Sequence, residues 1–156
     1  MAMESTAAFS KKASIEMSAL TTEQKNQALA SIRDALKANA ARILKENQAD
    51  LEQAKRDNLS EPLLKRLKFD QGKLDEVCEG INSLIALPDP VGRTLSATEL
   101  DRGLELYKVT CPIGVIGVIF ESRPDALVQI STLCLKSGNA VLLKGGSEAA
   151  RTNHIL

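Results

Sequence analysis

The sequence contains no tryptophan, and only 3% of its residues are aromatic. A protein that stacks the bases of single-stranded nucleic acid on aromatic side chains would need more of them. Lys and Arg together number 20, as do Asp and Glu, so the formal net charge is zero. Without a basic excess, neither a general nucleic-acid-binding surface nor a polybasic membrane anchor is expected. We therefore predict no nucleic-acid partner and no membrane partner.

Long apolar segments and signal sequences are also lacking. The longest apolar run, Cys111 to Phe120, has about half the length of a membrane-spanning helix. The N-terminus has no apolar core ahead of a cleavage site, as a secretory signal would have. The three cysteines are odd in number and have no CxxC spacing, which indicates reduced thiols and a cytoplasmic location. His154 is the only histidine, so no metal site is predicted.

Residues 1–90 are predicted to form a helical region. Thr21 and Gln24 have the spacing of a capping box at a helix N-terminus. A later apolar stripe has helical spacing throughout, and its members are Leu74, Val77, Cys78, Ile81, Leu84 and Ile85. Two prolines, Pro88 and Pro90, end this stripe because proline cannot continue a helix.

Residues 91–110 are predicted to form a β-hairpin. Thr94–Leu100 and Leu104–Val109 suit strands, and Asp101-Arg102-Gly103 between them suits a turn with a bulge. Alternation in the second strand leaves neither face cleanly apolar. The hairpin could therefore be either a contact between subunits or an ordinary sheet edge.

Residues 111–156 contain five of the nine glycines and are predicted to form a βαβ unit. Ile113–Phe120 is an uninterrupted apolar run, as expected of a strand buried on both faces. A helical pattern follows, and Ala140–Leu143 reads as a second strand parallel to the first. Two parallel strands alone leave open edges, so we expect the N-terminal portion of a longer α/β protein.

Two turns follow these strands, Glu121–Asp125 and Lys144–Glu148. Ligands of open parallel sheets bind beyond the carboxyl ends of the strands, where both turns are expected. Lys144-Gly145-Gly146-Ser147 offers a cation, close backbone approach and a hydroxyl at a helix N-terminus, and could hold a ribose or phosphate. On composition alone, the favoured interpretation is an ordinary turn in which Ser147 caps a helix and Lys144 is solvated. Neither common nucleotide-binding glycine motif is present.

The segment CPIGVIGVIFESRPDALVQISTLCLKSGNAVLLKGGSEA closely resembles γ-glutamyl phosphate reductases, also called glutamate-5-semialdehyde dehydrogenases, of the aldehyde dehydrogenase superfamily. PIGVIGVIFESRPD and VLLKGGSEA are its most specific parts. The resemblance extends over essentially the whole chain and corresponds to the N-terminal portion of these enzymes. It implies an α/β fold with N-terminal helices, a β-hairpin and the first βαβ unit of a Rossmann-type parallel sheet. Residues 1–156 would then be part of a cofactor-binding domain.

The resemblance also implies an activity, the NADPH-dependent reduction of L-glutamyl 5-phosphate to L-glutamate 5-semialdehyde and phosphate in proline biosynthesis. In this family a cysteine thiolate attacks the acyl phosphate, phosphate leaves, and hydride transfer reduces the resulting thioester. That cysteine is expected beyond Leu156. Cys78 and Cys134 instead belong to apolar stripes, and Cys111 has no basic neighbour. No catalytic residue is therefore assigned within the chain, which by itself is expected to be inactive.

The resemblance places NADP(H) at the two turns. Lys144 would contact the adenosine ribose or its 2′-phosphate, and Ser147 stands where NAD-preferring relatives often carry a glutamate. A hydroxyl at that position removes like-charge repulsion against a 2′-phosphate. Arg123 would hold the acyl phosphate, or it would instead pair with Glu121 or Asp125. The remaining residues assigned to the cofactor groove are Ile119, Phe120, Glu121, Ser122, Gly145 and Gly146.

Partners follow from the same resemblance. Relatives self-associate through a hairpin like that of residues 91–110, so a homo-oligomer is expected, and a glutamate 5-kinase could supply the substrate. Two alternatives remain. The chain could be a non-catalytic truncated paralogue that acts as an interaction module, or another aldehyde dehydrogenase relative with a different acyl substrate.

Overall fold

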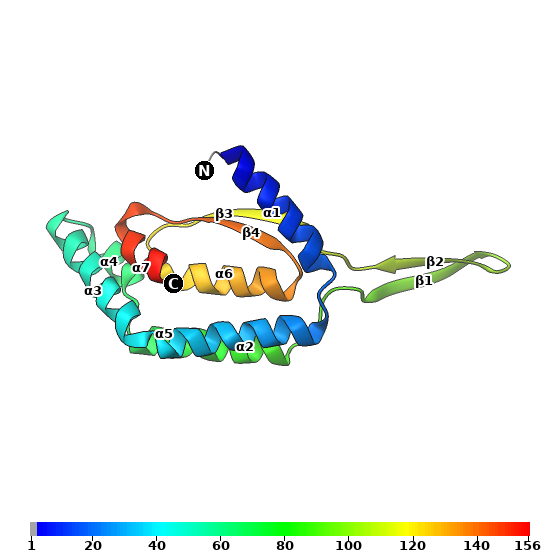
Figure 1. The fold of residues 1–156 in the computed structure, drawn as a ribbon, viewed down its shortest axis with the longest axis horizontal. Coiled ribbons are helices and arrows are strands. Elements are labelled where there is room, and N and C mark those ends of the chain that lie inside the picture. The colour runs from blue at the N-terminus through cyan, green and yellow to red at the C-terminus, as the bar shows by residue number, and fades with distance from the viewer. Residues whose placement is uncertain (1–2) are drawn as a thin grey trace.

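The computed structural model describes residues 3–156. Helices form its first half, a β-hairpin follows, and a parallel strand pair with an intervening helix completes it (Figure 1). This order confirms the α/β architecture predicted from the sequence. The elements are α1 (Met3–Ser18), α2 (Thr22–Ala38), α3 (Ala40–Arg56), α4 (Glu61–Leu67), α5 (Gln71–Ala86), β1 (Thr94–Asp101), β2 (Leu104–Val109), β3 (Val115–Ile119), α6 (Pro124–Lys136), β4 (Ala140–Lys144), the 3₁₀ helix η1 (Ser147–Ala149) and α7 (Ala150–Ile155).

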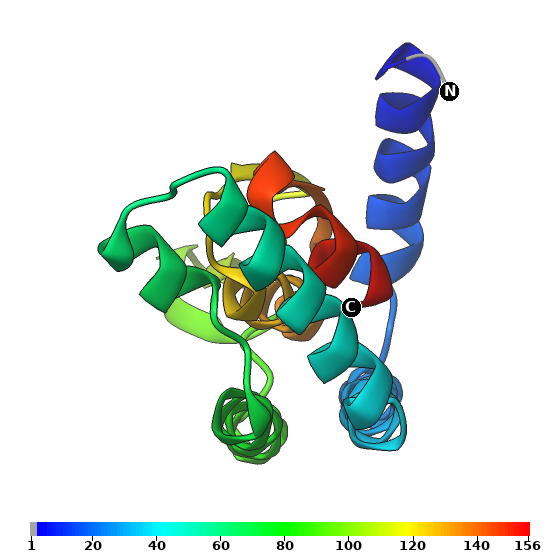
Figure 2. The same cartoon turned by 90° about the vertical axis from the view of Figure 1, so that its left-hand side faces the viewer.

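The predicted helix signals are confirmed in α2 and α5. At the start of α2, the Thr21 hydroxyl accepts a hydrogen bond from the backbone N–H of Gln24, and the Gln24 side chain accepts one from the N–H of Thr21. Helix α5 buries five of the six residues of its predicted stripe. Both helices run below α6 in Figure 1, are seen end on in Figure 2, and pack against α6. The main core therefore lies between α2, α5 and α6, with Leu29, Leu74, Ile81 and Val128 among its buried members.

A buried ion pair joins α2 to the segment before the hairpin. Lys25 is only 2% exposed, and its ammonium group lies 2.7 and 3.0 Å from the two carboxylate oxygens of Asp89. Asp89 also accepts hydrogen bonds from the Thr22 hydroxyl and the Val91 N–H, each at 2.9 Å. Burial alone would raise the pKa of Asp89, but the three donors outweigh it and lower that pKa. Asp89 thus fixes the start of the hairpin to the helical body.

The hairpin formed by β1 and β2 projects away from the rest of the molecule (Figure 1). Its strands pair antiparallel, with irregularities in register near both ends. At its base, Gly92 N–H donates to the Thr110 carbonyl at 2.9 Å, and Thr110 N–H donates to the Arg93 carbonyl at 3.0 Å. Both of its faces expose apolar side chains, namely Leu95, Leu100, Leu104, Leu106, Tyr107 and Val109.

Strands β3 and β4 are parallel, as predicted, and pair from Val115 with Ala140 to Ile119 with Lys144. Helix α6 connects them and lies below the strands in Figure 1, whereas α1 lies above and contacts both. Gly138 ends the connection with φ of +71°, a left-handed conformation that glycine adopts at helix ends. The two strands therefore end at the same edge, and the predicted turns follow there.

The prediction that the first of these strands is buried on both faces is wrong. No residue of β3 is fully buried, and Ile119 is 83% exposed. Strand β3 has the apolar composition of a central strand, but within residues 3–156 it pairs only with β4. Nothing in the same part of the chain covers Ile119, so the strand has the composition of a sheet centre and the surroundings of an edge.

Candidate functional site

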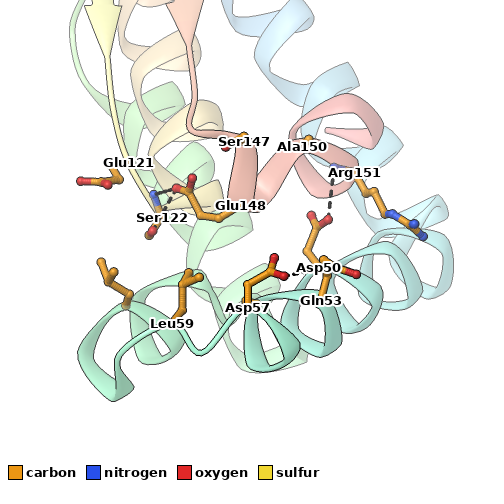
Figure 3. A pocket seen from close by; sticks show the side chains of 12 residues that line it. Asp50, Gln53, Asp57, Leu59, Glu121, Ser122, Ser147, Glu148, Ala150 and Arg151 are labelled. Atoms are coloured by element: carbon orange, nitrogen blue, oxygen red, sulfur yellow. Dashed lines mark hydrogen bonds between the residues drawn. The ribbon is translucent and has the colours of Figure 1, made fainter.

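A cavity of about 560 Å³ opens where β3 and β4 end (Figure 3). The turns after the strands form one side of it, and α3 with the segment that leads into α4 forms the other. Three of the residues assigned to the cofactor groove, Glu121, Ser122 and Ser147, line this cavity. Its lining consists of Asp50, Gln53, Ala54, Asp57, Leu59, Leu63, Glu121, Ser122, Ser147, Glu148, Ala150 and Arg151.

The two predicted turns lie against each other. Ile119 is the register partner of Lys144, and one residue further on the N–H of Phe120 donates to the Lys144 carbonyl at 3.1 Å. The Phe120 ring also approaches Gly145, where an added Cβ would lie 3.2 Å from the end of the ring. The structure thus brings Ile119, Phe120, Lys144 and Gly145 together at one edge of the sheet. The side chain of Lys144 is exposed.

Ser122 and Glu148 hold the turns together through side-chain hydrogen bonds. Glu148 Oε1 accepts from the Ser122 N–H at 2.5 Å and from the Ser122 hydroxyl at 2.9 Å. Figure 3 shows the Glu148 side chain directed toward Ser122. Burial would raise the pKa of Glu148, but its own N–H, the two Ser122 donors and the charge of Lys144 outweigh it and lower that pKa. The carboxylate is therefore held in its ionised form.

Asp50 on α3 occupies the N-terminus of α7. Its carboxylate accepts from the N–H and the hydroxyl of Thr152 at 2.8 and 2.7 Å. It also accepts from the N–H of Arg151 at 3.4 Å, as Figure 3 shows. Asn47, one turn earlier, donates to the Leu67 carbonyl and to the Thr152 hydroxyl. A carboxylate thus already takes the place in which an anion would bind at this helix.

Ser147 itself caps no helix through its side chain. It is exposed and begins η1, whose cap residue is Gly146, and no side-chain hydrogen bond caps η1 or α7 at the flanking residue. The alternative in which Ser147 serves as an N-cap is therefore wrong. The reason is that Asp50, from a distant helix, supplies the acceptor for α7.

The cavity is strongly acidic. Asp50, Asp57, Glu121 and Glu148 all line it, against the single cation Arg151. Phosphate groups would be repelled from its interior, which directs any phosphorylated ligand toward the exposed cations outside it. Two such cations border the turns, at positions 123 and 144.

Arg123 lies at the N-terminal end of α6. Its side chain is 54% exposed, and Nη2 lies 3.3 Å from an Asp125 carboxylate oxygen. The pairing that the sequence left open as an alternative is thus present. An exposed pair of this kind contributes little to stability, so the guanidinium remains able to contact a ligand.

The cysteines divide by burial, as predicted. Cys78 and Cys134 are 3% and 6% exposed, and burial raises the pKa of each thiol. A raised pKa reduces the thiolate that a nucleophile needs, so both are core residues. Cys111 is exposed. Within residues 3–156, no group of His, Cys, Asp and Glu side chains could hold a metal ion, and no helix is long and apolar enough to cross a membrane.

Asp50 and Glu148 were missed by reasoning from the sequence. Asp50 and Asn47 follow Ile43 at spacings that continue the buried face of α3, where apolar residues are expected. Polar residues in such positions are a recognisable sign of buried hydrogen bonding. For Glu148 the sequence offers no comparable sign, because its partner Ser122 belongs to another turn.

The fold is that of the aldehyde dehydrogenases. An acetylating aldehyde dehydrogenase from Geobacillus thermoglucosidasius superimposes on 92% of the chain with a TM-score of 0.61, at 13% sequence identity and over 29% of its own length. Within this class, the chain resembles the N-terminal portion of gamma-glutamyl phosphate reductase. No protein-family model matches the chain.

Two relatives carry this resemblance. The gamma-glutamyl phosphate reductase of Ruminiclostridium cellulolyticum is 67% identical over 144 residues, which are 92% of this chain and 33% of that protein. The crystal structure of the Saccharomyces cerevisiae enzyme of that name matches with a TM-score of 0.92 and 44% identity, over 97% of this chain and 39% of that one. The chain therefore spans about a third of the length of the curated relatives it matches.

Proposed function

We propose that this chain is the cofactor-binding N-terminal part of an oxidoreductase that reduces L-glutamyl 5-phosphate to L-glutamate 5-semialdehyde, releasing phosphate, in proline biosynthesis. The observation that carries the proposal is the 67% identity to a gamma-glutamyl phosphate reductase, together with two adjacent turns at the carboxyl edge of parallel strands. That edge is where α/β proteins bind nucleotides. We propose a cytoplasmic location for this enzyme.

The cofactor is proposed to be NADP(H), whose nicotinamide supplies the hydride for the reduction. Lys144 would contact the adenosine ribose or its 2′-phosphate, and the neutral Ser147 would leave room for that phosphate without repulsion. Residues 119–122, Gly145 and Gly146 would form the adjoining wall. The exposure of Lys144, Ser147 and Ile119 supports this assignment.

The chemistry itself is proposed to depend on a cysteine outside this chain. The thiolate would displace phosphate from the acyl carbon, hydride transfer would reduce the thioester, and collapse of the thiohemiacetal would free the aldehyde and the thiolate. Within the chain, Arg123 would hold the departing phosphate. Cys78 and Cys134 are too deeply buried to act, and the exposed Cys111 has no basic neighbour in the sequence to activate it, so residues 1–156 alone are expected to be inactive.

The hairpin is proposed to be a contact in a homo-oligomer. Its apolar side chains are exposed on both faces, and surfaces of this kind commonly mark protein–protein contacts. The same observation also favours the second candidate function, a non-catalytic interaction module. A glutamate 5-kinase as supplier of the acyl phosphate remains a proposal on chemical grounds, because the acyl phosphate is labile.

The test uses a fusion protein, which we call the chimera. It consists of this chain followed by the remaining two-thirds of the Ruminiclostridium cellulolyticum reductase. We expect the chimera to reduce NADP⁺ when given glutamate semialdehyde and phosphate, the reverse direction being chosen because the acyl phosphate is unstable. Residues 1–156 alone should not. Turnover by this chain alone would refute the assignment of the cysteines, and an inactive chimera that still forms oligomers would favour the interaction module.

The cofactor assignment has its own test in the chimera. Lys144→Ala should weaken NADPH binding more than NADH binding, and Ser147→Glu should shift the preference toward NADH by about tenfold or more, because a carboxylate would then face the 2′-phosphate. Fluorescence titration gives both dissociation constants. An unchanged NADPH affinity in Ser147→Glu would contradict this account of cofactor choice.

A further inference from the structure

We propose that Glu148 is a positioning residue that clamps the two cofactor turns together, an inference that rests on the proposed function. The clamp consists of Ser122, Gly146 and Glu148. Glu148 begins in the turn after β4 and reaches the turn after β3, where it accepts both the N–H and the hydroxyl of Ser122. It thereby joins the two segments that are to form one wall of the cofactor groove.

Ser122 shows that the clamp holds an unfavourable conformation. Its φ is +47°, in the left-handed region that serine seldom adopts. It is only 1% exposed, so water cannot readily replace a lost acceptor for its N–H or its hydroxyl. Glu148 supplies the acceptor for both groups. Without Glu148, Ser122 would be expected to relax, and the groove-lining backbone of residues 119–122 would move with it.

Gly146 shows that space is reserved for the Glu148 carboxylate. The backbone of Gly146 has φ of −73° and ψ of 158°, an extended conformation that any residue adopts. A Cβ built at this position would nevertheless overlap both carboxylate oxygens of Glu148. The glycine is therefore required by the clamp and not by its own backbone. An alanine here would push the carboxylate away from Ser122 while leaving Glu148 in the sequence.

The clamp also determines where the negatively charged Glu148 carboxylate points. Glu148 follows Ser147 directly, so the turn carries a carboxylate next to the position where a 2′-phosphate is proposed to bind. That carboxylate is directed to the Ser122 donors (Figure 3), and its lowered pKa keeps it ionised there. A carboxylate released from the clamp would be free to face the phosphate, so opening the clamp with Glu148 retained should weaken NADPH binding more than NADH binding.

The experiment compares Glu148→Ala, Gly146→Ala and the double variant in the chimera, by NADPH and NADH titration, steady-state kinetics and thermal unfolding. We expect Gly146→Ala, which releases the charged group, to raise the NADPH dissociation constant by about tenfold, the loss that corresponds to one hydrogen bond to a charged group. The NADPH dissociation constant of the double variant should not exceed that of the weaker-binding single variant, because either change opens the same clamp. The KM for the acyl substrate should rise less than the NADPH dissociation constant.

Matched controls separate the clamp from general destabilisation. Glu148→Gln keeps one accepting oxygen and should recover most of the affinity that Glu148→Ala loses. Glu52→Gln and Gly80→Ala make the same kinds of change at exposed positions of α3 and α5 away from both turns, and should leave the NADPH affinity unchanged. Additive effects of Gly146→Ala and Glu148→Ala, or equal losses for NADPH and the acyl substrate, would overturn the inference.

The clamp and the proposed function fail differently. If the unsubstituted chimera binds no NADPH, the proposed function is wrong, and the clamp is then judged by thermal unfolding alone. In that measurement Gly146→Ala should lower the Tm in the parent and leave it nearly unchanged in the Glu148→Ala background. If the chimera binds NADPH and the clamp variants bind it equally well, the function stands and the positioning role is wrong.

Discussion

Replacing Asp50 tests whether a buried carboxylate on α3 holds the start of α7. Asp50→Ala removes two short hydrogen bonds from Thr152, at 2.7 and 2.8 Å, and a longer one from Arg151, at 3.4 Å. Thr152 is fully buried, and its N–H would lose its protein acceptor. Hydrogen bonds to charged groups contribute about 1.5–3 kcal/mol each. Because water can partly fill the vacated space, we expect a total loss of about 3 kcal/mol.

The assay is urea unfolding of the chain, followed by far-ultraviolet circular dichroism. With a denaturant dependence of about 2 kcal/mol per molar urea, the midpoint should fall by about 1.5 M. Asp50→Asn keeps one accepting oxygen and should lose about half as much. Asp57→Ala is the matched control, since Asp57 is exposed on the same cavity and accepts one hydrogen bond from Gln53. Equal shifts for Asp50→Ala and Asp57→Ala would refute the capping role.

Three further predictions concern the same body of the molecule. Lys25→Met should cost about 3 kcal/mol of unfolding free energy, because it leaves the Asp89 carboxylate without its buried cation; a loss below about 1 kcal/mol would contradict this. Gly138→Ala should destabilise by about 1–2 kcal/mol, since its φ is +71° and its Cβ would meet Pro112 at 3.0 Å. Gly80→Ala, in open space on α5, should stabilise by about 0.5–1 kcal/mol, and similar effects at both glycines would argue against the conformational reason. The lowered pKa of Glu148 means that its contribution is complete above the ordinary value of 4.5 and is lost as the pH falls through the lowered one. As the pH is lowered, the free energy of unfolding should therefore fall less in Glu148→Gln than in the unsubstituted protein. Parallel curves would show that Glu148 contributes nothing to acid sensitivity.

Local sequence signals predicted most of the architecture. The capping box at Thr21 and Gln24 and the α5 stripe act within a few turns of the chain, so their effects can be read from neighbouring residues. The parallel pair was predicted because an apolar run, a helical pattern and a second run leave one common arrangement. It followed that the two turns meet at one edge, and the structure confirms this contact.

Long-range partners could not be predicted in the same way. Asp50 bonds to a residue 102 positions away, and its location on the buried face of α3 indicates a polar contact without indicating which helix end it meets. The exposure of Ile119 was missed for a related reason. Composition shows that a strand is apolar, but it does not show which neighbours cover it.

The base of the hairpin makes that arm separable from the body. Gly92 and Thr110 are joined by a hydrogen bond of 2.9 Å, so the chain leaves and re-enters the body at nearly one point. Residues 93–109 could accordingly be excised and the gap closed with a tight two-residue turn, without stretching the backbone on either side. The arm is in this sense an interchangeable unit, and exchanging it between relatives would replace the proposed subunit contact while leaving the edge formed by β3 and β4 unchanged.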